Sequence, residues 1–213
     1  NYSEYLWFEY KYGRDYADAH LNEAVKGYLS PGNELKDLVR FHYNSKEDMF
    51  DAVSYNKGGA ILHMLRSYLG DEAFKAGIKL YLNDNKYGTA EAHQLRLAFE
   101  KVSGKDLNWF FNQWYFSNGH PKLDVKYVLS EEASIVTVQI EQTQTNAFEF
   151  PLAIEVFEGD TPKRYEVWVD EKSKSFSFKY NETPDLVNVD ADRTLLVEIN
   201  DKKSVDKKIK EKK

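Results

Sequence analysis

The sequence predicts an α+β protein whose helices are gathered in its first half and whose strands are gathered in its second. Up to about residue 119, apolar residues recur at three- and four-residue spacing, the period of an amphipathic helix. After Pro121 they alternate with polar residues, the period of a strand with one buried face. Because the two periods occupy separate halves, the pattern favours two packed modules over an alternating α/β sheet.

Four helices are expected after an aromatic opening segment that itself has helical character. An apolar stripe over residues 60–69 predicts the first, which Gly70 ends. Asp71, Thr89 and Asp106 are candidate N-caps for the other three, since their side chains can accept the free N–H groups of a helix start. The last helix is strongly aromatic, must be buried, and is expected to run to Gly119 and Pro121.

The second half predicts six or seven short strands separated by turn-forming residues such as Gly159, Pro162 and Pro184. This number of strands is typical of a small β-sandwich. The alternating runs lie at residues 123–127, 135–141, 150–157, 165–169, 176–180 and 195–199.

We therefore place the domain boundary between Asn118 and Pro121, which divides the chain into three parts. Residues 1–119 form a helical part, residues 120–200 form the β-sandwich, and residues 201–213 are a Lys-rich tail. The tail holds too few apolar side chains to offset the entropy of ordering, so it is predicted to be disordered.

Composition excludes several classes of protein. Hydrophobic residues make up 42% of the 213 positions and aromatic residues 15%, too much for a disordered chain. The net charge is −6 and Lys and Arg are spread along the chain outside the tail, which disfavours nucleic acid as a partner. There is no Cys, so thiol catalysis and Cys-bound zinc are excluded. No apolar run approaches the roughly 18 to 20 residues of a membrane span.

Local chemistry alone predicts no catalytic or metal site. Two metal ligands on one helix face need a spacing of three or four residues, and no two histidines have it. Each histidine is therefore expected to be a surface or hydrogen-bonded structural residue. The five are His20, His42, His63, His93 and His120. A nucleophile elbow, a phosphate-binding loop and a dinucleotide fingerprint are also missing.

Two segments carry a resemblance to a known family. Residues 54–60 read Ser-Tyr-Asn-Lys-Gly-Gly-Ala, and residues 114–121 read Trp-Tyr-Phe-Ser-Asn-Gly-His-Pro. The first resembles the Tyr-x-Lys-Gly motif of the M1 (gluzincin) family of zinc aminopeptidases. The second resembles the W-x-x-x-x-G-x-P segment that joins the helical region of that family to its β-sandwich. Residues 1–5 look like the continuation of the helix whose N-E-G-F-A motif carries the third zinc ligand.

The order and spacing of these segments give the resemblance its weight, and it covers residues 1 to about 200. It implies that the helical part is the C-terminal portion of a thermolysin-like catalytic domain. By the same resemblance Tyr55 matches the family's catalytic Tyr, whose phenol would donate to the oxyanion formed when zinc-bound water attacks a peptide carbonyl. The two other motif residues are expected to have structural roles. Lys57 should lie at the surface, and Gly58 should allow close packing of the helix.

The chain also departs from the family pattern. The zinc-binding H-E-x-x-H and N-E-G-F-A motifs and the substrate-binding G-x-M-E-N strand are absent. We therefore interpret the chain as a fragment whose zinc ligands lie upstream of Asn1. The intact enzyme would bind zinc and release N-terminal amino acids from peptide substrates, whereas the fragment itself is expected to bind no zinc and to be inactive. Glu4 and Glu9 are not expected to replace the ligands, because neither has a partner His at a suitable spacing.

Two other functions remain open at this stage. A non-enzymatic module could bind a peptide or glycan through Trp168 and neighbouring aromatic side chains, and an adaptor could derive from a catalytically dead peptidase homologue. If the chain is a fragment, an apolar face near Tyr2, Tyr5, Phe8 and Tyr55 should be exposed, and self-association would cover it.

Overall fold

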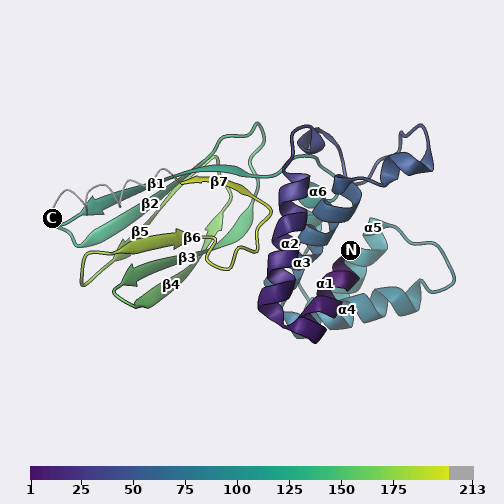
Figure 1. Ribbon diagram of the computed structural model, residues 1–213, viewed down its shortest axis with the longest axis horizontal. Coiled ribbons are helices and arrows are strands. Elements are labelled where there is room, and N and C mark those ends of the chain that lie inside the picture. The colour runs from purple at the N-terminus through teal and green to yellow at the C-terminus, as the bar shows by residue number, and fades with distance from the viewer. Residues whose placement is uncertain (202–213) are drawn as a thin grey trace. The chain divides into compact units, whose positions relative to one another are not determined.

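The computed structural model describes residues 1–201 and confirms the predicted α+β class. The chain divides into two compact units, residues 1–119 and the residues from His120 onward (Figure 1). Asp201, which we expected to begin the disordered tail, is the last residue of a strand and accepts a hydrogen bond from the hydroxyl of Tyr127 at 3.1 Å. The rest of the predicted tail, residues 202–213, lies outside the described residues.

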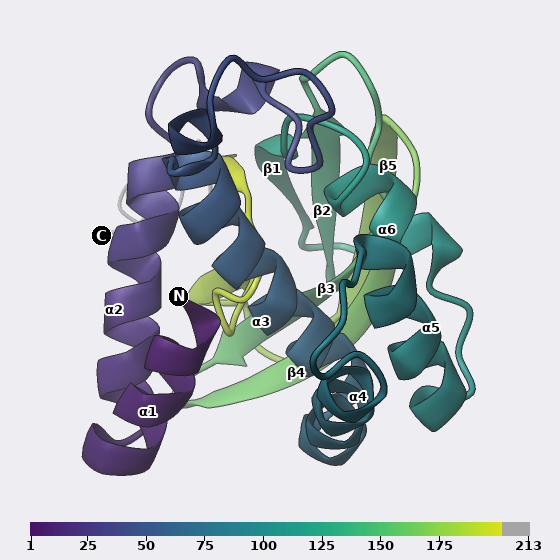
Figure 2. The same ribbon diagram turned by 90° about the vertical axis from the view of Figure 1, so that its right-hand side faces the viewer.

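Six α-helices form the described part of the first unit. They are α1 (Tyr2–Tyr12), α2 (Arg14–Tyr28), α3 (Gly58–Leu69), α4 (Asp71–Asp84), α5 (Ala92–Ser103) and α6 (Asn108–Trp114). Helices α1, α2 and α3 lie side by side, and α4 packs against α5 (Figure 2). The connection from α2 to α3 contains two 3₁₀ turns, Asn33–Leu35 and Lys46–Met49, and a π-helical turn, Val53–Lys57.

Helix α3 follows the predicted stripe, but other helix boundaries differ from the expected ones. Thr89 does not begin α5. The N-cap is Glu91, which forms a capping box with Gln94 and whose own N–H donates to the Gln94 amide oxygen at 2.9 Å. Helix α6 ends at Trp114, well before Gly119. Helix α2 was not anticipated, because its residues are mostly polar and its buried stripe is narrow.

Asp71 also has a different role from the expected one. It is the first residue of α4, and its carboxylate binds the guanidinium of Arg66 at 2.7 Å. The same guanidinium binds Glu9 at 2.7 Å, and Arg66 is only 4% exposed. One buried arginine therefore connects α1, α3 and the start of α4, and Glu9 is occupied in an ion pair rather than free to bind a metal.

His63 on α3 makes the stability of the helical unit sensitive to acid. It is buried and its Nδ1 lies 3.2 Å from the hydroxyl of Tyr2. Burial, helped by the positive charges of Arg14 and Arg66, lowers its pKa from 6.5 to about 4. Between these values the unfolded chain binds a proton that the folded protein does not, so stability is lost as the pH falls from about 6.5 to about 4.

We expect His63 to contribute a loss of about 3 kcal/mol over that range, at roughly 1.4 kcal/mol per unit of pKa difference. Denaturant unfolding at several pH values between about 7 and about 4 measures it. In the variant His63→Gln, whose amide oxygen can still accept from Tyr2, the decline should be shallower by that amount. Parallel pH profiles for the two proteins would contradict the assignment.

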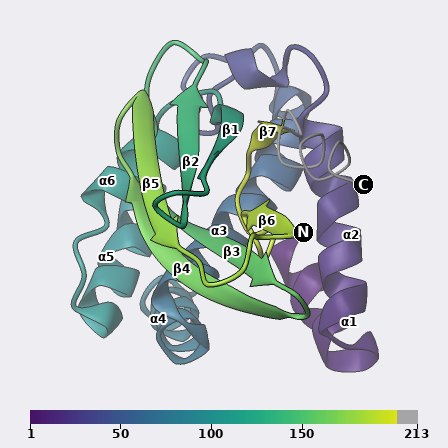
Figure 3. The same ribbon diagram turned by 90° about the vertical axis from the view of Figure 1, so that its left-hand side faces the viewer.

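The second unit is a sandwich of two sheets (Figure 3). One sheet has the order β5-β2-β1-β7 and the other the order β4-β3-β6. Among the strand pairs of residues 120–201, β1 and β7 alone are parallel. The strands are β1 (Lys122–Ser130), β2 (Ile135–Gln142), β3 (Phe150–Glu158), β4 (Thr161–Val169), β5 (Ser173–Lys179), β6 (Leu186–Val189) and β7 (Glu198–Asp201). Alternate residues of β1, β2 and β3 are buried, as the sequence period predicts.

Two strands differ from the sequence prediction. Pro162, expected to lie in a turn, is the second residue of β4, which tolerates it because β4 is an edge strand of its sheet. Strand β6 was missed, because its four residues, which follow the turn formers Pro184 and Asp185, are too short a run to reveal alternation. Its pairing with β3 comes from tertiary packing.

Candidate functional site

Tyr55 lies in the π-helical turn that leads into α3. The N–H of Gly58 reaches back to the carbonyl of Val53, five residues earlier, which places one extra residue in the turn. The Tyr55 side chain is 43% exposed and its ring lies 5.8 Å from the ring of Phe50. Turns of this type are rare and occur frequently at functional sites, so the local backbone is itself a feature of interest.

The inner side of the turn holds Val53 and Lys57, which are both fully buried. The Lys57 ammonium donates to the carbonyl of Ser117 at 3.1 Å and lies 5.9 Å from the centre of the Tyr28 ring. Burial lowers the pKa of Lys57 from 10.5 to about 8. The expectation that Lys57 lies at the surface was wrong. Lys57 is two residues after Tyr55, which places it on roughly the opposite face of the helical turn, and that face is buried.

Gly58 is not required for close packing, contrary to expectation. A Cβ built at Gly58 would meet only the Leu38 side chain, at an ordinary contact distance of 3.8 Å. The close approach is made instead by Gly27 of α2, where a Cβ would lie 2.8 Å from the Asn56 amide nitrogen. Helix α2 therefore packs directly against the turn through Gly27.

An ion-pair network holds the N-terminal end of the turn. The Arg40 guanidinium donates to both carboxylate oxygens of Asp51, at 2.7 and 3.2 Å, and to the Ser54 hydroxyl at 2.8 Å. Asp51 also accepts from the backbone N–H of Ser54 at 2.9 Å. Burial alone would raise the pKa of Asp51, but the hydrogen bonds from Arg40 and Ser54 outweigh it and hold the pKa below its usual range.

Asn1 holds the turn from a third direction. Its side-chain amide donates to the backbone carbonyl of Tyr55 at 2.8 Å and lies 3.4 Å from the Asn56 side-chain oxygen. The backbone on both sides of the Tyr55 side chain is therefore fixed, while the side chain itself reaches solvent. Sequence reasoning missed Arg40, Asp51 and Asn1. An Asp shortly before a helical segment is a favoured N-cap that can accept the backbone N–H three residues on, and this preference could have indicated the contact between Asp51 and Ser54.

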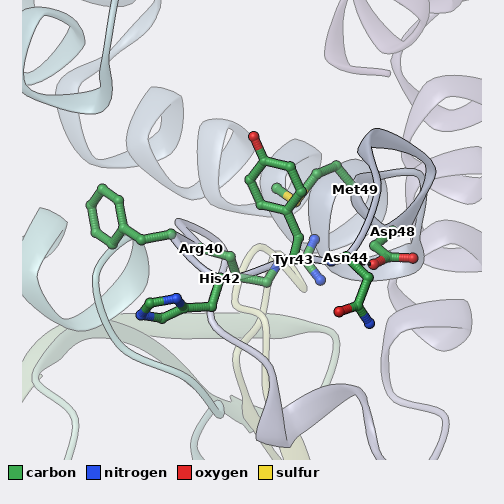
Figure 4. Close-up of a pocket in the computed structure, with 7 residues that line it drawn as sticks. Arg40, His42, Tyr43, Asn44, Asp48 and Met49 are labelled. Atoms are coloured by element: carbon green, nitrogen blue, oxygen red, sulfur yellow. Dashed lines mark hydrogen bonds between the residues drawn. The ribbon is translucent and has the colours of Figure 1, made fainter.

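An open hollow of about 440 Å³ shares Arg40 with this network. Figure 4 shows Asn44 and Asp48 on one side of Tyr43 and His42 on the other. The segment that forms it also exposes large apolar side chains close to Tyr55 in sequence, namely Phe41, Tyr43 and Phe50. Of these side chains, Phe50 has its ring within contact distance of the exposed Tyr55 phenol.

The described residues do not fit a zinc ion. Within residues 1–201, no three His, Cys, Asp or Glu side chains come together in a group that could hold a metal. The His63 ring is paired with Tyr2, and His120 lies 2.6 Å from Glu198. These two histidines have the hydrogen-bonded structural role that the sequence analysis expected.

The expected apolar face is only partly exposed. Tyr2 and Tyr5 are buried, stacked on each other with ring centres 5.0 Å apart and packed against His63. Phe8 is half-buried, and Tyr55 is exposed. The expectation was wrong for Tyr2 and Tyr5 because His63 of α3 packs against both rings, with Phe74 of α4 also against Tyr2. The Tyr5 hydroxyl in addition donates to Asp18 of α2 at 2.6 Å. Exposed aromatic side chains of α1 and α2 are Trp7, Tyr10, Tyr12 and Tyr16.

The sandwich shows no exposed aromatic cluster in its described part. Its exposed large apolar side chains there are Val128 and Leu186, and Trp168 on β4 is half-buried. Among the helices of residues 1–201, none combines the length and the apolar character needed to cross a bilayer.

Comparison with known proteins gives matches along most of the chain. Residues 5–114, slightly more than half of it, match the model of the peptidase family M1 domain. The chain is 42% identical over 89 residues to Tricorn protease-interacting factor F2 of Thermoplasma acidophilum, which is 39% of this chain and 11% of that protein. It is 36% identical over 127 residues to probable aminopeptidase 2 of Sulfurisphaera tokodaii, covering 55% of this chain and 16% of that protein.

A third relative is the alanine/arginine aminopeptidase of Saccharomyces cerevisiae, 34% identical over 140 residues, or 63% of this chain and 16% of the relative. The chain thus spans 11% to 16% of the length of these relatives. A crystal structure of Legionella pneumophila aminopeptidase A in complex with aspartic acid has a similar fold, with a TM-score of 0.76 at 17% identity. That match covers 93% of this chain and 23% of the Legionella chain.

Proposed function

This chain belongs to peptidase family M1, and from that membership we propose that it is part of a zinc aminopeptidase in which Tyr55 stabilises the transition state. The proposal rests on the position of Tyr55, whose backbone is held in place while its side chain is exposed. Its backbone is held by Asn1, and the residue before it by Arg40 and Asp51, while its side chain stays 43% exposed. A hydroxyl aimed from a fixed backbone can donate to a developing oxyanion without reorganising.

The proposed substrates are peptides, from which the intact enzyme releases the N-terminal amino acid. Support comes from the names of similar proteins, which include aminopeptidases of Sulfurisphaera tokodaii and Saccharomyces cerevisiae. The solved Legionella pneumophila aminopeptidase A holds aspartic acid, a single amino acid. In this chain the exposed rings of Tyr55 and Phe50, whose centres lie 5.8 Å apart, could offer apolar contacts to a substrate side chain.

The zinc of the intact enzyme would be bound by residues outside this chain. We assign the helical unit, residues 1–119, to the C-terminal portion of the catalytic domain, and the sandwich, residues 120–200, to a packing platform. Because a zinc-activated water needs ligands that the H-E-x-x-H motif would supply, we propose that the chain by itself is inactive.

Metal content and peptidase activity, measured on this chain and on the complete product of its gene, test the proposal. Mass spectrometry and an aminoacyl-coumarin assay should find one zinc and activity in the complete product, and neither in this chain alone. Stoichiometric zinc in this chain would mean that it holds a site of its own. No activity in either protein would overturn the enzyme proposal in favour of the adaptor or of a binding module.

A further inference from the structure

A buried ammonium group lies under the turn that carries Tyr55. Lys57 is fully buried and donates one hydrogen bond, to the backbone carbonyl of Ser117 at 3.1 Å. No carboxylate of the described residues forms an ion pair with it, and the charge of Asp37 offsets only part of the cost of burial. An apolar side chain of similar length would fill the same space without desolvating a charge, so packing alone does not explain a lysine here.

The partner of Lys57 is a rigid anchor. Ser117 follows α6, in which Phe110, Phe111 and Trp114 are buried. Its hydroxyl donates to the carbonyl of Asn112 at 2.9 Å, which fixes the chain just beyond the helix. The Lys57 side chain therefore ties the end of the π-helical turn to a part of the fold that is separated from it by 60 residues.

The turn needs such a tie because its geometry is unfavourable by itself. A π-helical turn contains one more residue than the α-helical turn that the same backbone could form with α3. If the turn relaxed to α-helical hydrogen bonding, the residues that precede α3 would rotate about the helix axis by about 100°, the angle between successive residues of an α-helix. Tyr55 and Lys57 lie on nearly opposite sides of the turn, so holding Lys57 inward keeps the Tyr55 side chain outward.

The other contacts leave this task to Lys57. Arg40 and Asp51 hold Ser54, at the N-terminal end of the turn, and Asn1 holds the Tyr55 carbonyl. The C-terminal end of the turn, where α3 begins, is held by the hydrogen bond that the Lys57 side chain donates to Ser117.

We propose that Lys57 is a positioning residue for Tyr55, acting through the π-helical turn that it ties to Ser117. The inference rests on the proposed function, since it assigns Lys57 a part in the same reaction without contact with the substrate. A positioning residue should affect kcat through Tyr55 and not independently of it.

A double-mutant cycle in the complete gene product tests this. Lys57→Met, which keeps the chain length and removes the donor, should lower kcat by about 10²-fold, the scale of a small misplacement of a reacting group. In a Tyr55→Phe background the same change should lower kcat by less than about threefold, because the hydroxyl that it positions is already gone. The KM should change little in either background.

Lys105→Met is the matched control. Lys105 also donates to a backbone carbonyl, that of Tyr68 at 3.3 Å, and lies over the Tyr68 ring, but at the opposite end of α3 from Tyr55. Its loss should leave kcat unchanged. Circular dichroism verifies that each variant is folded. If Lys57→Met does not fold, Lys57→Arg, which keeps a donor at a longer reach, enters the same cycle.

An equal loss of kcat in both backgrounds, or no loss in either, overturns the inference. If Tyr55→Phe alone leaves kcat unchanged, the proposed function has failed instead. In that case fluorotyrosine NMR of this chain still decides whether Lys57 sets the side chain. The resonance assigned by Tyr55→Phe should shift in Lys57→Met and not in Lys105→Met, and an unchanged resonance overturns the positioning role.

Discussion

Replacing Tyr55 with Phe is expected to lower the kcat of the complete gene product by about 10²- to 10³-fold, the loss that follows removal of one oxyanion donor. The ring would keep its contact with Phe50, whose centre lies 5.8 Å away, so the variant removes the hydroxyl and little else. Because the donor is used only in the transition state, kcat and kcat/KM should fall together. Steady-state kinetics with an aminoacyl-coumarin substrate measures both.

Tyr87→Phe is the control for this experiment. Tyr87 is an almost fully exposed phenol between α4 and α5, outside the candidate site, and removing its hydroxyl should leave both parameters unchanged. A Tyr55→Phe variant that kept kcat within a few-fold of the original, or that changed only KM, would show that the phenol does not act on the transition state.

Replacing Phe99 with Ala is expected to lower the free energy of unfolding of the helical unit by about 3–5 kcal/mol, the usual cost of deleting a buried aromatic ring. Phe99 of α5 is fully buried and stacks on Phe74 of α4 with ring centres 5.4 Å apart. The opposing helix leaves room for the ring only because it has a glycine there, since a Cβ built at Gly77 would lie 2.3 Å from the ring. Denaturant unfolding followed by tryptophan fluorescence gives the value.

Two further variants make this measurement specific. Leu97→Ala, on the same helix but half exposed, should lower the free energy of unfolding by less than about 1 kcal/mol. Gly77→Ala alone should destabilise the unit by about 1–3 kcal/mol, because it overpacks the ring. In the Phe99→Ala background, Gly77→Ala should become neutral or stabilising, since the clash is gone and Ala favours the helix. Additive costs would mean that Gly77 and Phe99 do not share one packing site.

The class of the fold, and the place where helices give way to strands, can be predicted from the sequence. The change of period at Pro121 is a local property of the chain, and so is the apolar stripe of α3 that ends at Gly70. Tyr55 can be proposed as a catalytic residue from the sequence alone, because its motif is a contiguous string whose order with the Trp114–Pro121 segment resembles a known family. These signals need no information about which residues meet in space.

The residues that surround Tyr55 could be found only in the folded structure. Lys57 turned out to be buried because its ammonium meets a carbonyl 60 residues away, and no local pattern predicts such a partner. Asn1 meets the Tyr55 carbonyl across 54 residues, and Arg40 reaches Asp51 and Ser54 across a segment without regular period. Strand β6 likewise exists through its pairing with β3. Periodicity shows which face of a segment is buried, whereas the partner on that face depends on the path of the whole chain.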